Sequence, residues 1–175
     1  MTDRVESYLA REEIHELSCR YMRGLDRLDG ALLLAQFWHD GWCEYGFFNG
    51  SPSEFVVFAM QALATHRANQ HMLGQTLIDI DGHEAFGEVY FRAYHQVETP
   101  EGLEDLVIAG RYLDRYERRD GLWKLAYRSE IVDWSHSGPS NASYFELAPD
   151  CLRGGRQDDA VYRRDNRYRP SNTTD

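Results

Sequence analysis

The sequence predicts an α+β domain in which three N-terminal helices pack on a strongly curved, mostly antiparallel sheet that forms a half-open cone. In the first 66 residues, most apolar side chains recur at three- and four-residue steps, the spacing of one helix face. From residue 70 onward, the pattern changes to alternation at every second residue, with turn sequences between the runs. A long, curved sheet wrapped around helices leaves a cavity at its open end.

The helices follow from periodicity and from capping signals. We expect the first over residues 7–28, the second over 31–38 and the third from an N-cap at Ser53 to about His66. A short strand over 42–48 separates the second helix from the third. The buried face of the first helix carries Ile14, Leu17, Tyr21, Leu25 and Leu28.

Four strands follow, bounded by turns of which Asp81-Gly82 is the strongest hairpin signal. Gly87 and Gly110 lie inside strands, where glycine often marks a bulge or a bend. The predicted strands cover residues 70–80, 85–98, 106–118 and 122–134. One face of the second strand carries, at a period of two, Ala85, Gly87, Val89, Phe91, Ala93 and Val97.

After residue 134 the alternation stops, so we divide the chain into a domain over 1–134 and a C-terminal extension over 135–175. The extension is rich in Gly, Pro, Ser, Asn and Arg. We expect it to wrap around the domain or a neighbouring subunit. An alternative is a lid on the cavity, formed by Tyr144, Phe145 and Leu147.

Composition excludes several function classes. The chain has 19 basic and 29 acidic residues, a net charge of −10, which disfavours nucleic acid as a partner. Its three cysteines include no close pair, which argues for a reducing, cytoplasmic location and against a zinc site. We find no membrane span, no glycine-rich nucleotide loop and no metal-binding motif, so we expect no metal and no cofactor.

Several polar residues interrupt otherwise apolar segments and are candidates for chemistry: Tyr21, Asp26, His71, His95 and Arg128. Each also has a purely structural interpretation, such as solvent exposure for Asp26 and core packing for Tyr21. Aromatic residues are plentiful, and rings line pockets for flat apolar ligands. Together with His95, we expect these rings to bind the substrate: Trp38, Tyr45, Phe58, Phe91 and Tyr112.

Three segments resemble a known family. Residues 20–29 (RYMRGLDRLD) resemble the first-helix motif of SnoaL-like proteins, and residues 70–74 (QHMLG) resemble their strand motif with an active-site histidine. Residues 116–125 (YERRDGLWKL) resemble their penultimate hairpin. The resemblance implies the cone-shaped, cystatin-like α+β barrel shared by nuclear transport factor and scytalone dehydratase.

Two members of that superfamily suggest roles for individual residues. The Tyr, Asp and His of bile-acid 7α-dehydratase match Tyr21, Asp26 and His71. The Asp–His pair and the Arg of hexachlorocyclohexane dehydrochlorinase match Asp26, His71 and Arg128. A lysine of the latter enzyme is Tyr21 here, which favours the dehydratase-like set over halide elimination.

The resemblance implies a cofactor-independent lyase that acts on a small hydrophobic cyclic or aromatic substrate. His71 would remove a proton from carbon, Asp26 would orient the imidazole, Tyr21 would donate to an oxygen and Arg128 would stabilise negative charge. The alternatives are an isomerase or polyketide cyclase with Asp26 as the base, a non-catalytic ligand-binding domain, and the small subunit of a ring-hydroxylating dioxygenase. We expect a homo-oligomer, either a dimer or a trimer.

Overall fold

The computed structural model describes residues 4–141 and 143–162. The helices are α1 (Arg4–Arg27), α2 (Gly30–Leu34), α3 (Pro52–Ala64) and α4 (Ser143–Leu147), with a 3-10 turn at Ala160–Tyr162. The strands are β1 (Phe37–Glu44), β2 (Asn49–Gly50), β3 (Ala68–Asp81), β4 (Glu84–Thr99), β5 (Gly102–Arg119) and β6 (Leu122–Pro139).

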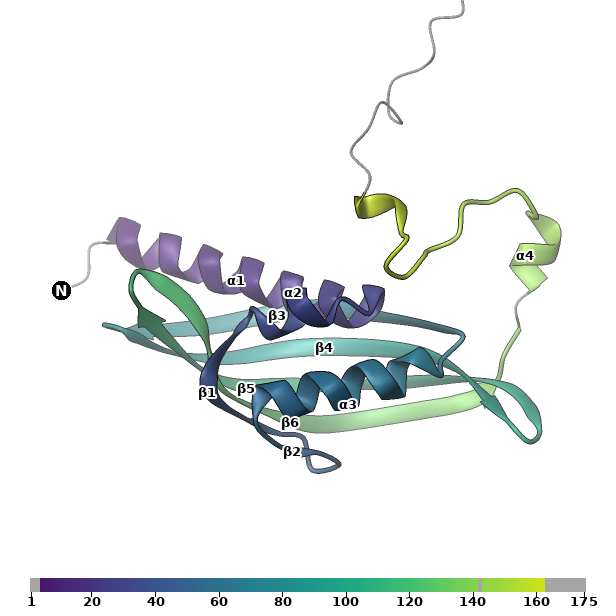
Figure 1. Ribbon diagram of the computed structural model, residues 1–175, viewed down its shortest axis with the longest axis horizontal. Coiled ribbons are helices and arrows are strands. Elements are labelled where there is room, and N and C mark those ends of the chain that lie inside the picture. Colours follow the sequence, from purple (N-terminus) through teal and green to yellow (C-terminus); the bar gives the residue numbers. More distant parts are fainter. Residues whose placement is uncertain (1–3, 142, 163–175) are drawn as a thin grey trace, which may run out of the picture.

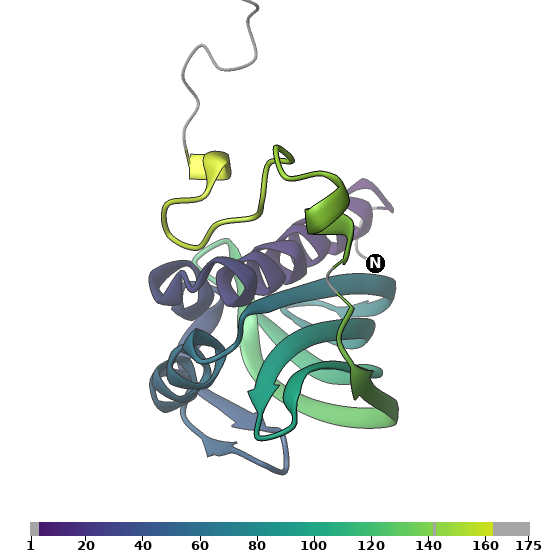
Figure 2. The same ribbon diagram turned by 90° about the vertical axis from the view of Figure 1, so that its right-hand side faces the viewer.

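The six strands form one sheet in the order β2-β1-β6-β5-β4-β3. All neighbours are antiparallel except β1 and β6, which are parallel. The sheet curls around α1, α2 and α3, which cover its concave side (Figures 1 and 2). The predicted α+β cone is therefore confirmed.

The core lies between α1 and the concave face of the sheet. Ile14, Leu17 and Tyr21 of α1 are buried, as the helical periodicity predicts. Every second residue of β4 faces them, including Ala85 and Val89, which are fully buried. The period-two pattern of this strand therefore identified its inner face correctly.

Gly110 marks a bulge, as expected for a glycine inside a strand. The register between β5 and β6 shifts between Ala109 and Gly110. A Cβ atom at Gly110 would lie 2.0 Å from the carbonyl oxygen of Ile131, so the two strands approach too closely for any side chain.

The region between α1 and α3 differs from the sequence prediction. The second helix ends at Leu34 rather than residue 38, and the first strand begins at Phe37 rather than residue 42. Phe37 pairs with Leu125 of β6, and the Leu125 amide donates to the carbonyl of Gln36. Pairing with a strand distant in sequence overrides the local helical pattern here.

The N-cap of α3 is Ser51, not Ser53. The Ser51 hydroxyl accepts from the Glu54 amide, and the Glu54 carboxylate accepts from the Ser51 amide, which is a capping box. Pro52 occupies the first turn, where a missing amide hydrogen costs nothing. Ser53 therefore lies inside the helix, and its hydroxyl only contacts that of Ser51.

Replacing Ser51 by alanine should lower the free energy of unfolding by about 1 kcal/mol, because the Glu54 amide loses its acceptor and the Glu54 carboxylate loses the hydroxyl that donates to it. Urea denaturation measures this value. Ser53→Ala is the matched control, and we expect a change below about 0.5 kcal/mol. Equal destabilisation by both variants would contradict the assignment of the cap.

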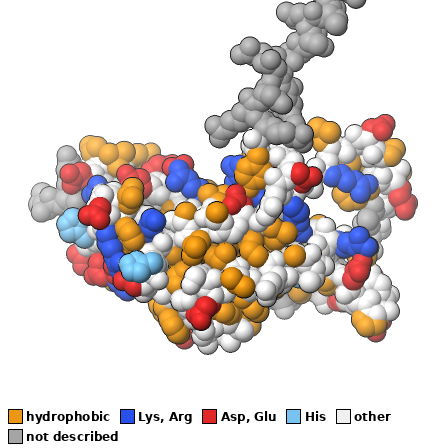
Figure 3. Space-filling model, in the orientation of Figure 1, with side chains coloured by type: hydrophobic (Ala, Val, Ile, Leu, Met, Phe, Trp, Pro, Cys, Tyr) orange, Lys and Arg blue, Asp and Glu red, His pale blue; other side chains and the backbone are white. Residues whose placement is uncertain are grey.

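Hydrophobic side chains gather across the middle of the face in Figure 3, over the helices that cover the sheet. The opposite face of the sheet also exposes large apolar side chains, among them Met72, Phe86 and Leu113. Among the described residues, no helix is both long enough and apolar enough to span a bilayer.

Candidate active site

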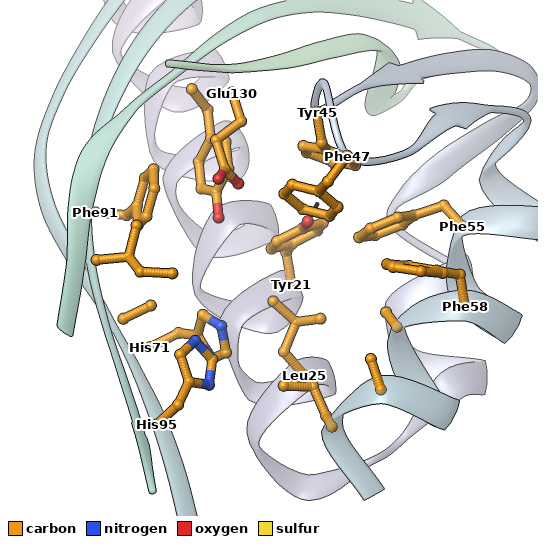
Figure 4. Close-up of a pocket in the computed structure, with 16 residues that line it drawn as sticks. Tyr21, Leu25, Tyr45, Phe47, Phe55, Phe58, His71, Phe91, His95 and Glu130 are labelled. Carbon is orange, nitrogen blue, oxygen red and sulfur yellow. Dashed lines mark hydrogen bonds between the residues drawn. The ribbon is translucent and has the colours of Figure 1, made fainter. Parts of the chain in front are cut away.

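A cavity of about 220 Å³ lies between the helices and the concave face of the sheet. Its walls are mostly aromatic, and Figure 4 shows the rings of Phe55 and Phe58 opposite Phe91. Tyr45 and Tyr112 also line it, as the sequence predicted. The volume is below the roughly 300–1,000 Å³ of pockets for drug-sized ligands, so a ligand of one or two rings fits best.

Asp26 and His71 meet at one end of this cavity. Asp26 lies in the last turn of α1, and His71 faces it from β3. The distance between Asp26 Oδ1 and His71 Nδ1 is 2.8 Å, and the side chains are only 11% and 7% exposed. The same carboxylate accepts from the His71 amide and from Asn69 Nδ2, at 2.9 and 3.0 Å.

This geometry determines the tautomer of the His71 ring. A carboxylate can only accept hydrogen bonds, so Nδ1 must carry the proton that points at Asp26. In the neutral ring, Nε2 therefore carries the lone pair that a general base requires. Because His71 lines the cavity, a bound ligand lies within reach of this ring.

Tyr21 and Tyr45 bring two hydroxyl groups into the middle of the cavity wall. The two oxygens are 3.0 Å apart, and both side chains are buried (Figure 4). Burial raises the pKa of both phenols, so each remains protonated at neutral pH. One hydroxyl donates to the other, and the Tyr45 hydroxyl also lies within hydrogen-bond reach of the Cys43 thiol.

His95 lines the cavity beside His71, with 5.2 Å between the ring centres. Its Nδ1 lies 3.2 Å from Nδ1 of His66. Burial, reinforced by the nearby rings of His71 and His66, lowers the pKa of His95 to about 3. His95 is therefore neutral, so it adds a polar but uncharged group to the cavity wall.

Arg128 does not line the cavity, contrary to expectation. It is fully buried behind the wall, and its Nε and Nη2 donate to the two carboxylate oxygens of Asp114, both at 2.8 Å. Its guanidinium lies 4.2 Å from the ring centre of Tyr21 and 4.1 Å from that of Tyr112. A buried cation needs a carboxylate partner, and Asp114 supplies one from the directly opposite position on the neighbouring strand β5.

Trp38 also lies outside the cavity. It follows Phe37, which is buried, so the alternation along β1 turns Trp38 to the other face. Its indole Nε1 donates to the carbonyl of Glu117, and Arg119 and Lys124 pack against its ring. The sequence prediction put Trp38 at the end of a helix and began the strand at residue 42, so it did not show that Trp38 faces away from the cavity.

Sequence reasoning missed two polar residues of this site, Asn69 and Glu130. Asn69 precedes His71 by two positions and therefore shares its face of β3. Glu130 follows Arg128 by two positions on β6 and lines the cavity. The period-two rule that identified the inner face of β4 could have found both residues.

The sequence matches the model of the SnoaL-like domain over residues 6–129, which is well over half of the chain. The chain belongs to the SnoaL-like family. No curated protein is significantly similar to it in sequence.

Solved structures share this SnoaL-like fold at low sequence identity. A putative scytalone dehydratase from Novosphingobium aromaticivorans is 21% identical with a TM-score of 0.67, and the match covers 78% of this chain and 92% of that one. A hexachlorocyclohexane dehydrochlorinase from Novosphingobium barchaimii is 17% identical with a TM-score of 0.70, covering 79% and 97%. A putative aromatic ring hydroxylase from N. aromaticivorans is 18% identical with a TM-score of 0.65, covering 73% and 92%. These similarities support the fold assignment. At identities of 17–21% they show the fold alone and not an activity.

β6 continues to Pro139, so the last strand runs past its predicted end at residue 134. Residues 143–162 of the extension lie beyond the SnoaL-like match and fold back over the end of α1 (Figure 2). Arg156 donates to the carbonyls of Asp26 and His66, at 3.0 and 3.1 Å, and to the side chain of Asn69. Arg27 of α1 donates in turn to Asp159, at 3.1 Å. The described part of the extension thus touches the residues that hold the Asp26–His71 pair.

The position of α4 does not support the alternative that this segment forms a lid on the cavity. Tyr144, Phe145 and Leu147 are exposed, and none of them lines the cavity between the helices and the sheet. The part of the expected extension over residues 163–175 lies outside the described residues. Within residues 4–141 and 143–162, no three His, Cys, Asp or Glu side chains are grouped to hold a metal ion.

Replacing Arg156 by alanine should release the extension from α1 and β3, because the guanidinium connects both elements. We expect a loss of about 1–2 kcal/mol in unfolding free energy and faster hydrogen exchange over residues 153–162. Arg153→Ala is the matched control, since that guanidinium lies over the ring of Phe145. Identical exchange in both variants would show that Arg156 does not anchor the extension.

Proposed function

We propose that this SnoaL-like protein is a cofactor-independent lyase that eliminates water from a small cyclic or aromatic substrate. One observation carries the proposal: a histidine held by a buried carboxylate faces an aromatic cavity with its second nitrogen free. In this arrangement, the imidazole is oriented before the substrate arrives, and its charged form is stabilised once it takes a proton.

The reaction begins when His71 Nε2 removes a proton from a ring carbon of the substrate. The electron pair of that C–H bond forms a double bond as the C–O bond on the neighbouring carbon breaks. The departing hydroxide takes up a proton, ultimately the one held by His71, and leaves as water. Atoms and electrons balance without an oxidant or a reductant.

The hydroxyls of Tyr21 and Tyr45 would bind the oxygen on which charge develops. Their raised pKa values keep them as donors at neutral pH. The apolar walls exclude water, which strengthens these hydrogen bonds. Arg128 would act indirectly, since its cation lies against the face of the Tyr21 ring and favours negative charge near the phenol oxygen.

An isomerase or polyketide cyclase is the second candidate. The Tyr21 and Tyr45 hydroxyls fit an isomerase as well as a lyase, because an enolate oxygen and the oxygen of an elimination intermediate need the same hydrogen-bond donors. The exposed apolar side chains on the outer face of the sheet are consistent with a homo-oligomer, which we propose for either function.

The test is incubation with a panel of one- and two-ring hydroxyketones and hydroxylated aromatics, followed by mass spectrometry and NMR. Loss of the mass of water supports the lyase, and a new compound of unchanged mass supports the isomerase. Tight binding with no chemical change across the panel would contradict both and indicate a binding domain. Co-purification of an iron-containing chain would instead indicate a dioxygenase subunit.

A further inference from the structure

Glu130 places a second carboxyl group in the cavity, remote from Asp26. It lies on β6, across from Tyr112 on β5, with its side chain on the inner face of the sheet. Figure 4 shows Glu130 at the opposite end of the cavity from His71 and His95, with Tyr21 between them. A ring that fills the cavity would therefore contact the histidines at one end and Glu130 at the other.

The Glu130 carboxyl group has no strong partner within the described part of the chain. No side chain or amide there donates a hydrogen bond to it. Arg128, two positions earlier, is engaged by Asp114 through two of its nitrogens. A polar group that lines an apolar cavity without a partner is available to a ligand.

The charge state of Glu130 follows from its surroundings. Burial raises the pKa of Glu130 to about 7, and the guanidinium of Arg128 opposes this rise. Near neutral pH a large share of the carboxyl groups is therefore protonated and can donate an O–H hydrogen bond. The titratable and charged groups that face the cavity or pack behind it near Glu130 are Tyr21, Tyr45, His71, His95, Tyr112 and Arg128.

We propose that Glu130 is a specificity-determining residue that binds a carbonyl or hydroxyl oxygen on the end of the ligand opposite the carbon deprotonated by His71. The assignment rests on the proposed function and names its substrate class, a one- or two-ring compound with an oxygen at each end. Because the neutral acid donates, it selects an oxygen acceptor. Because the ionised form carries negative charge, it repels carboxylate ligands.

The alternative is a structural role in which Glu130 offsets the charge of Arg128. That role predicts lower stability on removal of the carboxyl group, whatever the ligand. The ligand-binding role predicts a change confined to ligands that carry the matching oxygen. Two probes of the same ring skeleton separate them: α-tetralone, which has a ketone oxygen, and tetralin, which has none.

The experiment is calorimetric titration of both probes into wild type, Glu130→Leu and Glu130→Gln at about pH 6, where the neutral form of Glu130 predominates. Glu130→Leu should weaken α-tetralone binding by about tenfold, the effect of one hydrogen bond, and leave tetralin binding unchanged. Glu130→Gln keeps a neutral donor of the same shape and should retain α-tetralone affinity within about threefold.

The pH dependence gives a second readout. Between about pH 6 and 8.5, Glu130 loses its proton, so α-tetralone should bind wild type more weakly as pH rises. Glu130→Gln should show no such fall. Every other titratable group of the cavity remains in that variant, so the difference isolates Glu130.

Equal α-tetralone affinity in all three proteins would overturn the proposal. Parallel weakening of both probes with a lower melting temperature would assign Glu130 to structure and also overturn it. If neither probe binds wild type, the cavity does not take the ring-shaped ligand that the Glu130 proposal requires, and the proposal fails. Binding is measured without turnover, so a failure of the His71 chemistry alone leaves this result unaffected.

Discussion

Replacing His71 by alanine should lower turnover by about 10²–10⁴-fold while the fold survives, because the variant lacks the general base. Asp26→Asn should cause a loss of similar order, because a neutral amide no longer stabilises the imidazolium. Steady-state kinetics on the substrate identified by the panel measures both effects. The loss should appear mainly in kcat, since neither substitution removes the aromatic walls that bind the ring.

His83→Ala and Asp79→Asn are matched controls for these two variants. Both positions are exposed, Asp79 near the end of β3 and His83 in the turn that joins β3 to β4. Circular dichroism and melting temperature should show that all four variants remain folded. Turnover within about threefold of wild type in both His71→Ala and Asp26→Asn would reject the proposed base.

Replacing Asp114 by alanine should destabilise the protein by about 3–5 kcal/mol, because it leaves the buried guanidinium of Arg128 without its counter-charge. Asp114 is 4% exposed and Arg128 is 0% exposed, so neither water nor salt can compensate. The substitution also removes the acceptor of the Tyr116 hydroxyl, which lies 2.5 Å from Asp114. Denaturant unfolding followed by tryptophan fluorescence measures the loss.

Two further variants make this result specific to the buried pair. Asp133→Ala breaks an ion pair of Arg111 in which Asp133 is 38% exposed, and should cost less than about 1 kcal/mol. Replacing both Asp114 and Arg128 by leucine removes the unpaired charge and should recover much of the stability. An Asp114→Ala loss no larger than that of Asp133→Ala would contradict the account of this pair.

Residues whose environment is set locally were predicted well from the sequence. The inner face of α1 and that of β4 follow from their periods of 3.6 and two, and both are confirmed. The hairpin at Asp81-Gly82 also forms, with Gly82 in the left-handed region at a φ of 62°. These features depend on backbone geometry over a few residues, which the sequence displays directly.

The errors lie where distant strands decide the structure. Phe37 and Trp38 carry a helical pattern, yet pairing with β6 makes them a strand and turns Trp38 away from the cavity. Arg128 was expected at the site because it interrupts an apolar strand and matches the arginine of the dehydrochlorinase, but its depth is set by Asp114 of the neighbouring strand. Inward direction is visible in a sequence, whereas distance from the cavity is not.

The site itself was predicted in part. The sequence placed Asp26 and His71 on elements that the structure brings to within 2.8 Å of each other. It missed Arg156, because no periodicity connects a residue in an irregular segment to the carbonyls of α1. A contact of that kind is created only when the whole chain has folded.

The central claim is that His71 removes a proton from carbon, and hydrogen exchange measures that step without a complete reaction. The probe is a β-tetralone with a phenolic hydroxyl on its distal ring, which offers an oxygen at one end and ketone-activated hydrogens at the other. In D2O, followed by proton NMR, wild type should exchange those hydrogens at least about 100-fold faster than His71→Ala. Equal exchange rates with wild type and His71→Ala, despite binding of the probe to both proteins, would contradict the account.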